Sequence, residues 1–348
     1  MSGFITIALI FLVFIIIYQI AKASEYASVI RGEEKVKVQT NRTVAWLLVI
    51  FFLLGMWGIW KCHMLLQDKM LPVSASVQGV QYDLMFKATL WVTGITFFIT
   101  QALLFWFCFK YQSTEKRTSF FFPHNNRLEV LWTTVPAIAM AALVAVGLKN
   151  WMAFTSEAPK DAMIVEVVGK QFNWLIRYPG HDGVLGKRDF RKIDDANNVL
   201  GLDWNDKDNM DDIIAQNGEL HLVVNKPVKL LIGSRDVIHD VGLAHFRMKM
   251  DAVPGIVTTM WFTPQYTTEE MKKITGKENF VYEISCDQVC GTSHYAMRGT
   301  VIVQTQAEYD AWIMKQQSYY SSTHTPVAPA QGAPAAAKTD STKAITMK

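Results

Sequence analysis

Four long apolar stretches before residue 152 constrain the fold of this chain more than any other feature of its sequence. They span residues 4–20, 44–60, 88–109 and 128–148. A helix rises about 1.5 Å per residue, so each stretch crosses most of a hydrocarbon core about 30 Å thick. Because only a helix satisfies every backbone group within such a segment, we predict four transmembrane helices. No basic residue precedes the first stretch and no small-residue cleavage site follows it cleanly, which favours a retained helix over a signal peptide.

Basic residues are unevenly distributed over the loops between these stretches. Residues 21–43 and 110–127 contain five and four lysines or arginines, whereas residues 61–87 contain three. By the positive-inside rule the first and third loops are cytoplasmic, so both termini and the part after residue 151 face a periplasm-like space. The net charge is +3 for the whole chain, but +6 for residues 1–151 and −5 for residues 152–318. This balance excludes a polybasic nucleic-acid binder.

From residue 162 the pattern changes to short β-rich runs separated by Gly and Pro, which is typical of an all-β sandwich or barrel. Strands are predicted at 162–168, 171–178, 220–224, 228–233, 258–263, 280–285 and 299–304, with a short helix at 307–315. An acidic insertion at about 184–219 lacks the Gly and Glu spacing of an EF-hand. We interpret it as a solvated loop, with a docking surface for a basic partner as the alternative.

The composition also predicts where the parts of the chain begin and end. Residues 1–71 and 72–151 each hold two of the predicted membrane helices, and residues 152–318 form the exported domain. Residues 319–348 are rich in Ala, Pro, Thr and Ser, which predicts a flexible tail without a core of its own.

The sharpest motif occupies residues 286–297, with the sequence Cys-Asp-Gln-Val-Cys-Gly-Thr-Ser-His-Tyr-Ala-Met. It places Cys286, Cys290, His294 and Met297 in one loop between two predicted strands, and a second histidine, His239, lies upstream. Thiolate, imidazole and thioether ligands on a β scaffold are typical of cupredoxin copper sites. A blue-copper site uses one cysteine, whereas two cysteines can bridge two copper ions with one histidine as the terminal ligand of each.

Such a site also has weaker ligands, and a disulfide and a zinc site are the alternatives to it. Met297 and a backbone carbonyl, that of Gln288, are the candidate axial ligands that tune the potential. A disulfide between the two cysteines is ordinary in an oxidising compartment, but it leaves the histidines and the methionine without a role. Zinc has little use for a thioether. We therefore predict copper.

These motifs resemble subunit II of cytochrome c oxidase, the heme–copper terminal oxidase, over about residues 72–316. The resemblance implies two helices before a cupredoxin domain with the dinuclear centre CuA, which accepts electrons from cytochrome c and passes them to heme in subunit I. There O₂ is reduced to water with proton pumping. CuA would be ligated by His239, Cys286, the carbonyl of Gln288, Cys290, His294 and Met297. The resemblance also implies a bacterial inner membrane and contacts with subunit I and other oxidase subunits.

Two further carboxylates acquire roles from the same resemblance. Glu129, in Glu-Val-Leu-Trp-Thr-Thr-Val-Pro, resembles the family carboxylate at the entrance of a proton channel, although it could simply pair with Arg127 or stabilise a helix N-terminus. Asp251, in Lys-Met-Asp-Ala-Val-Pro-Gly, falls in the region near the CuA and magnesium sites.

The chain departs from the family pattern at three places. Gln288 stands where the family has a glutamate that helps to bind magnesium, and a neutral amide is a poorer ligand for that cation. Phe172 replaces the tryptophan that receives electrons, while Trp174 is kept, and these two residues are the expected electron-entry pair. The two extra N-terminal helices are expected to bind a neighbouring subunit or complex. Together with Phe172 they fit a fixed membrane-bound donor such as alternative complex III, with cytochrome c as the other candidate donor.

Other functions remain to be distinguished. No Cys-x-x-Cys-His motif occurs, so we expect no heme on this chain. A quinol-oxidase subunit II typically lacks the copper ligands. A membrane-tethered copper chaperone or thiol redox protein would hold one labile copper or a disulfide, and would give Glu129 no role.

Overall fold

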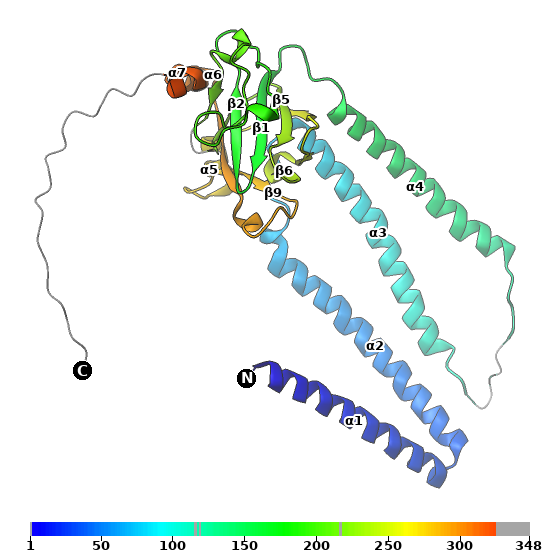
Figure 1. Cartoon of the computed structure of the whole chain (residues 1–348). Coiled ribbons are helices and arrows are strands. Elements are labelled where there is room, and N and C mark those ends of the chain that lie inside the picture. The colour runs from blue at the N-terminus through cyan, green and yellow to red at the C-terminus, as the bar shows by residue number, and fades with distance from the viewer. Residues whose placement is uncertain (1, 115–116, 118–119, 216–217, 325–348) are drawn as a thin grey trace, which may run out of the picture. The chain divides into compact units, whose positions relative to one another are not determined.

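The computed structural model describes residues 2–114, 117, 120–215 and 218–324. It divides into two compact units (Figure 1). The first comprises Met1–Ser74 and Val80–Ala153, and the second comprises Ala75–Gly79 and the chain from Phe154 onward.

The first unit consists of long apolar helices, which confirms the predicted membrane-spanning part. They are α1 (Ser2–Arg31), α2 (Glu33–Leu66), α3 (Val77–Lys110) and α4 (Asn126–Thr155). All four are long and apolar enough to cross a membrane, with a mean hydropathy of 1.8 to 2.2 in their spans. Edge-on aromatic contacts join α2 to α3, where the ring centroids of Trp46 and Phe109 lie 4.9 Å apart.

The helices extend well beyond the apolar stretches that predicted them. Each has 30 to 34 residues, and residues 21–43, which we expected to form a loop, are helical except at Gly32. The polar residues of this segment are compatible with helical geometry, so α1 continues to Arg31 and ends only at Gly32, which has a positive φ. Gly32 has φ 89°, which a residue without Cβ adopts at little cost.

The second unit is a sandwich of two five-stranded sheets, which confirms the predicted all-β domain. One sheet has the order β3-β2-β1-β5-β8 and the other the order β4-β10-β9-β6-β7. The strand bounds are β1 Met163–Lys170, β2 Asn173–Tyr178, β3 Ile213–Ile214, β4 Leu220–Val223, β5 Val228–Ser234, β6 His239–Leu243, β7 Met248–Ala252, β8 Thr258–Phe262, β9 Tyr282–Cys286 and β10 Arg298–Gln304. Helix α5 (Thr268–Thr275) follows β8. Helices α6 (Gln306–Ile313) and α7 (Tyr319–His324) follow β10.

The core lies between the two sheets. Alternate residues of β1 and β5 point inward, and Val165, Val167, Leu230 and Ile232 have no exposed surface. The opposite sheet contributes Leu222, Tyr282, Ile284 and Val301, among others. Burial of apolar surface stabilises a fold by about 25 cal/mol per Å². This core therefore holds the strand ends, and the loops between them, in fixed positions.

The start of α3, together with the two residues before it, is anchored in the β-sandwich. The Ala75 N–H donates to the carbonyl of His245, and the Val77 N–H donates to that of Thr263. The Ser76 hydroxyl donates to the carbonyl of Phe246 over 2.7 Å. Residues 75–79 therefore belong to the second unit although α3 continues into the first.

The acidic insertion is not the solvated loop that its composition suggested. Asp212 is fully buried and, with Glu166, pairs with Arg177 over 3.0 and 2.6 Å. Burial raises the pKa of Asp212 to about 7, which outweighs the opposite effect of Arg177. Asp203, which is partly exposed, accepts a hydrogen bond from Lys192. Asp212 thus binds the insertion to β2 through Arg177, whereas the Asp203 pair lies within the insertion itself.

A small apolar cluster fastens the insertion from its other side. Val168 of β1 packs there with Leu200 and Leu202, and Tyr319 of α7 lies against them. The Tyr319 hydroxyl accepts from the Val199 N–H over 3.1 Å. The predicted tail therefore starts too early, because α7 occupies its first six residues, and residues 325–348 lie outside the described part.

Candidate metal centre

The predicted ligands come from the ends of three strands that lie side by side in one sheet. His239 begins β6, Cys286 ends β9, and Met297 directly precedes β10. Antiparallel pairing places Val241 of β6 opposite Cys286, and the Cys286 N–H donates to the carbonyl of Met297 over 3.0 Å. The strand ends are thus fixed by the sheet, and the loop after β9 only has to fold back over them.

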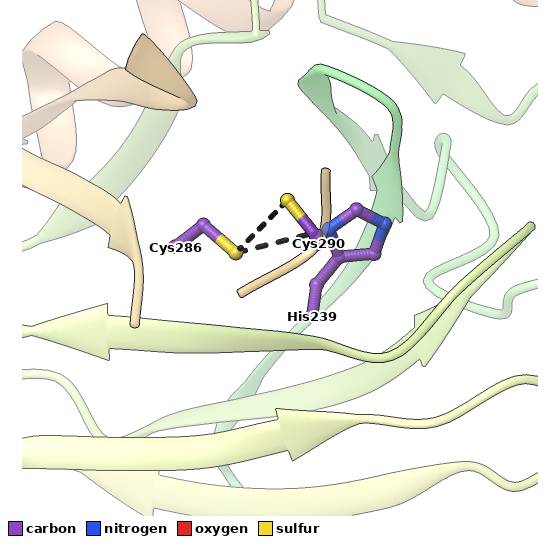
Figure 2. Close-up of side chains that lie close together, drawn as sticks. All are labelled: His239, Cys286 and Cys290. Atoms are coloured by element: carbon purple, nitrogen blue, oxygen red, sulfur yellow. Dashed lines mark hydrogen bonds between the residues drawn. The ribbon is translucent and has the colours of Figure 1, made fainter. Parts of the chain in front are cut away.

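The donor atoms of all six predicted ligands converge on one site. Figure 2 shows the two thiols facing each other with the ring of His239 beside them, and the two sulfur atoms lie 3.8 Å apart. A disulfide would require about 2.05 Å, and both cysteines are free. The remaining contacts are Cys286 Sγ to His239 Nδ1 at 3.8 Å and to the Gln288 carbonyl at 3.2 Å, and Cys290 Sγ to His294 Nδ1 at 3.8 Å and to Met297 Sδ at 3.9 Å.

The site is nearly closed to solvent. His239 and Met297 have no exposed surface, both cysteines are buried, and His294 is half-buried. Burial, together with the hydrogen bond from Cys286, raises the pKa of Cys290 to about 11. A metal bound here must displace the thiol proton, which favours cations with high affinity for thiolate. Two thiols, two imidazoles and a thioether fit copper.

Asp236, which the sequence analysis missed, lies directly behind one of the histidines. Its carboxylate accepts a hydrogen bond from His239 Nε2 over 2.7 Å and another from the Gln171 N–H over 2.7 Å. Burial works to raise the pKa of Asp236, but these N–H groups outweigh it and the pKa is lowered. The ring therefore carries its proton on Nε2 and presents the lone pair of Nδ1 to the thiols. The signal in the sequence was a carboxylate three residues before a candidate ligand.

The two expected electron-entry residues occupy different places. Phe172 is half-buried beside the ligand loop, where a Cβ on Gly291 would lie 2.9 Å from its ring. The side chain of Gln171 donates to the carbonyl of Cys290 over 2.6 Å. Trp174 is only 1% exposed, and its ring centroid lies 6.1 Å from that of His239. Only Phe172 is therefore within reach of an external partner.

Asp251 does not contact the cysteines or histidines in any hydrogen bond of the described residues, and it is connected to the site through Asp240. It lies opposite Asp240 in the β6–β7 pair, and Asp240 directly follows His239. Burial first, and then the hydrogen bond to Asp251, raise the pKa of Asp240 to about 6. The carbonyl of Asp240 accepts from the Asp287 N–H over 3.2 Å, which connects this strand pair to the ligand loop.

Two other candidate residues have contacts within their own part of the fold. Glu129 is in the first turn of α4, where its carboxylate accepts from the Asn125 N–H over 3.4 Å. This contact agrees with the helix-terminus role weighed for it. His245 packs edge-on against Phe280 and Tyr282, with centroids 5.1 and 5.4 Å apart, and belongs to the aromatic core.

The chain matches two family models. Residues 163–305 match "Cytochrome C oxidase subunit II, periplasmic domain", and residues 56–149 match "Cytochrome C oxidase subunit II, transmembrane domain". The matched ranges include all six predicted ligands, Glu129 and both predicted electron-entry residues.

Individual proteins are similar over the same region. "Alternative cytochrome c oxidase subunit 2" of Bradyrhizobium diazoefficiens is 37% identical over 231 residues, which are 66% of this chain and 78% of that protein. Cytochrome c oxidase subunit 2 of Cereibacter sphaeroides is 27% identical over 69% of this chain and 77% of that protein. Among solved structures, the periplasmic domain of subunit II of cytochrome oxidase (CoxB) of Bradyrhizobium japonicum aligns over 45% of this chain and 95% of that chain, with 22% identity and a TM-score of 0.31.

Proposed function

The chain belongs to the cytochrome c oxidase subunit II family, and from this premise we propose that it holds the dinuclear copper centre CuA through which electrons enter the oxidase. It is a membrane protein with a periplasmic domain and a component of a heme–copper oxidoreductase complex, in which it assembles with other oxidase subunits. The observation that carries the proposal is the facing pair of thiols, each 3.8 Å from Nδ1 of a different histidine.

A dinuclear copper centre supplies reversible one-electron transfer when it is bound. Cys286, Cys290, His239 and His294 would hold such a centre through their sulfur and imidazole nitrogen atoms. Met297 and the carbonyl of Gln288, which contact the two cysteines, would complete the set of donors. The enclosing sandwich keeps water away from these side chains and fixes their positions, so little has to reorganise when the charge changes.

Phe172 and Trp174 have successive roles in electron entry. Phe172 receives the electron from the donor because it is half-buried and its ring touches the ligand loop at Gly291. Trp174 is buried against His239 and connects the site to the interior of the domain. The donor is cytochrome c or a membrane-bound cytochrome-bearing complex, and the acceptor is heme in subunit I.

The membrane part completes the proposal. Both termini and the copper domain face the periplasm of a bacterial inner membrane. Glu129 admits protons to a channel that leads into subunit I, from a position at the start of α4. A magnesium ion at the subunit I interface would meet the neutral and exposed amide of Gln288 in place of a carboxylate, which weakens that site.

Copper analysis of the purified oxidase that contains this chain tests the proposal. We expect the wild-type complex to hold two more copper ions than a complex in which Cys286 and Cys290 are both replaced by Ser. We also expect an electron paramagnetic resonance signal from one unpaired electron shared by two coppers, which the variant lacks. A copper chaperone or thiol redox protein would instead show one labile copper or a disulfide. Either of those results, or a mononuclear blue signal, would refute the proposal.

A further inference from the structure

One carboxylate joins the predicted copper ligand to the electron-entry segment. Asp236 uses both of its oxygens: Oδ1 accepts from His239 Nε2 over 2.7 Å, and Oδ2 accepts from the Gln171 N–H over 2.7 Å. Gln171 directly precedes Phe172, and its side chain donates to the carbonyl of Cys290 over 2.6 Å. Gln171 is therefore held by two hydrogen bonds: its backbone N–H binds Asp236, which contacts His239, and its side chain binds the carbonyl of Cys290.

The two histidine ligands differ in this respect. His239 is fully buried, and its second ring nitrogen has a carboxylate partner. His294 is half-buried, and within the described residues its Nε2 has no hydrogen-bond partner. A carboxylate behind a ligating imidazole fixes its tautomer and orientation and raises its basicity. The site is therefore asymmetric, with one firmly oriented histidine on the side of Phe172.

From these contacts we propose that Asp236 is a positioning residue that orients His239 toward the metal and, with the same side chain, fixes the Gln171-Phe172 segment against the ligand loop. The inference rests on the proposed function and adds a specific residue to it. Both oxygens of the carboxylate are required to accept these two hydrogen bonds, because an amide has only one acceptor oxygen. In Asp236→Asn the amide nitrogen would face one of the two N–H groups and lose that link, and the other N–H group would keep only a neutral acceptor in place of a charged one, so both links are weakened.

The matched control is Asp195→Asn. Asp195 pairs with Lys170 over 2.9 Å and with Arg235 over 2.6 Å, the residues directly before Gln171 and Asp236. This variant removes the same charge from the same region, but Asp195 touches neither His239 nor Gln171. Loss of a negative charge or general loosening would affect both variants alike, whereas loss of positioning affects only Asp236→Asn.

The test uses the purified oxidase with a copper chelator as competitor. We expect Asp236→Asn to lower copper affinity by about 10- to 100-fold and to alter the histidine nitrogen couplings in the magnetic resonance spectrum, while Asp195→Asn stays within about threefold of wild type. If wild type holds the dinuclear centre and Asp236→Asn has the same affinity and couplings, the inference is wrong although the proposed function stands. If Asp195→Asn reproduces the effect, the inference is also wrong.

Hydrogen exchange of the copper-free protein gives a second readout that needs no metal. Loss of a hydrogen bond to a carboxylate should speed exchange of the Gln171 amide about tenfold or more in Asp236→Asn, with the β1 and β5 amides unchanged. Equal protection of the Gln171 amide in both proteins would overturn the proposed link even if the variant bound no copper.

Discussion

Gly169 of β1 lies under His239, and its lack of a side chain makes room for this proposed copper ligand. A Cβ at this position would lie 2.6 Å from Cδ2 of His239 and 2.8 Å from Cγ of the same ring. Carbon atoms pack at about 3.5–4.0 Å, so Gly169→Ala forces the ring to move by about 1 Å. Gly169 is paired with Trp174 of β2 and Ser234 of β5, so the strand itself has little freedom to retreat.

The expected cost can be worked from these contacts. Overpacking a well-packed interior costs about 1–3 kcal/mol. If the displaced ring also loses its hydrogen bond to Asp236, the free energy of folding becomes less favourable by about a further 1.5–3 kcal/mol, because the acceptor is charged. Disturbing a group that orients a ligand typically costs about 10- to 100-fold in metal affinity. We therefore expect Gly169→Ala to weaken copper binding by at least about tenfold although no ligand has been replaced.

Chelator competition on the purified oxidase measures this loss, and the nitrogen couplings of the copper signal report the orientation of the ring. Gly233→Ala in the neighbouring strand is the matched control. A Cβ there would meet only the end of the flexible Arg188 side chain, at 3.4 Å. Wild-type copper affinity and unchanged couplings in Gly169→Ala would refute the reasoning, as would an equal loss in Gly233→Ala.

The remaining predictions concern stability and proton entry. Replacing Arg177 by Met leaves Glu166 and Asp212 buried without their cation, and should lower the free energy of unfolding by about 3–5 kcal/mol, seen as faster hydrogen exchange in β1 and β2. Since the pKa of Asp212 is raised from 3.8 to about 7, its contribution to stability is present below pH 4 and is lost as the pH rises toward 7. The stability of wild type relative to Asp212→Asn should therefore fall between about pH 4 and about pH 7, and a constant difference would contradict the assignment. Trp174→Ala should cost about 3–5 kcal/mol in the same exchange experiment, because it leaves a cavity beneath the copper site. Glu129→Gln should lower the number of protons taken up per electron without changing the copper content, and normal proton uptake would leave this residue only its helix-terminus role.

Much of the fold, and the grouping of the candidate ligands in one place, could be predicted because their signals are local. Membrane helices follow from runs of apolar residues, and the ligands of residues 286–297 lie within one loop, so their spacing alone brings them together. The strands β6 and β7 were missed because His239, Asp240, Lys249 and Asp251 make them look like loops. Their polar groups are satisfied by cross-strand and site contacts, which a single sequence does not reveal.

Residues that act across the fold were also beyond sequence reasoning. The only signal for Asp236 was its spacing from His239, and Gly169 had none, because the contacts of both depend on the pairing of β1 with β5 and on the loop that leads into β6. The carboxylates of the insertion looked solvated because Arg177, the partner of the buried Asp212, lies 35 residues earlier in the chain. Composition reports charge, but it cannot report which charges are paired.

The anchoring of the first turn of α3 has a consequence for how the protein is made. The hydroxyl of Ser76 donates to a carbonyl 170 residues further along the chain. At about 5–20 residues per second, a ribosome needs roughly 9–34 s to synthesise that partner after Ser76 itself has been made. During this interval the hydroxyl of Ser76 has no Phe246 carbonyl to which it can donate. The link between the start of α3 and the sandwich can therefore form only late in synthesis, after the chain has been made as far as Phe246.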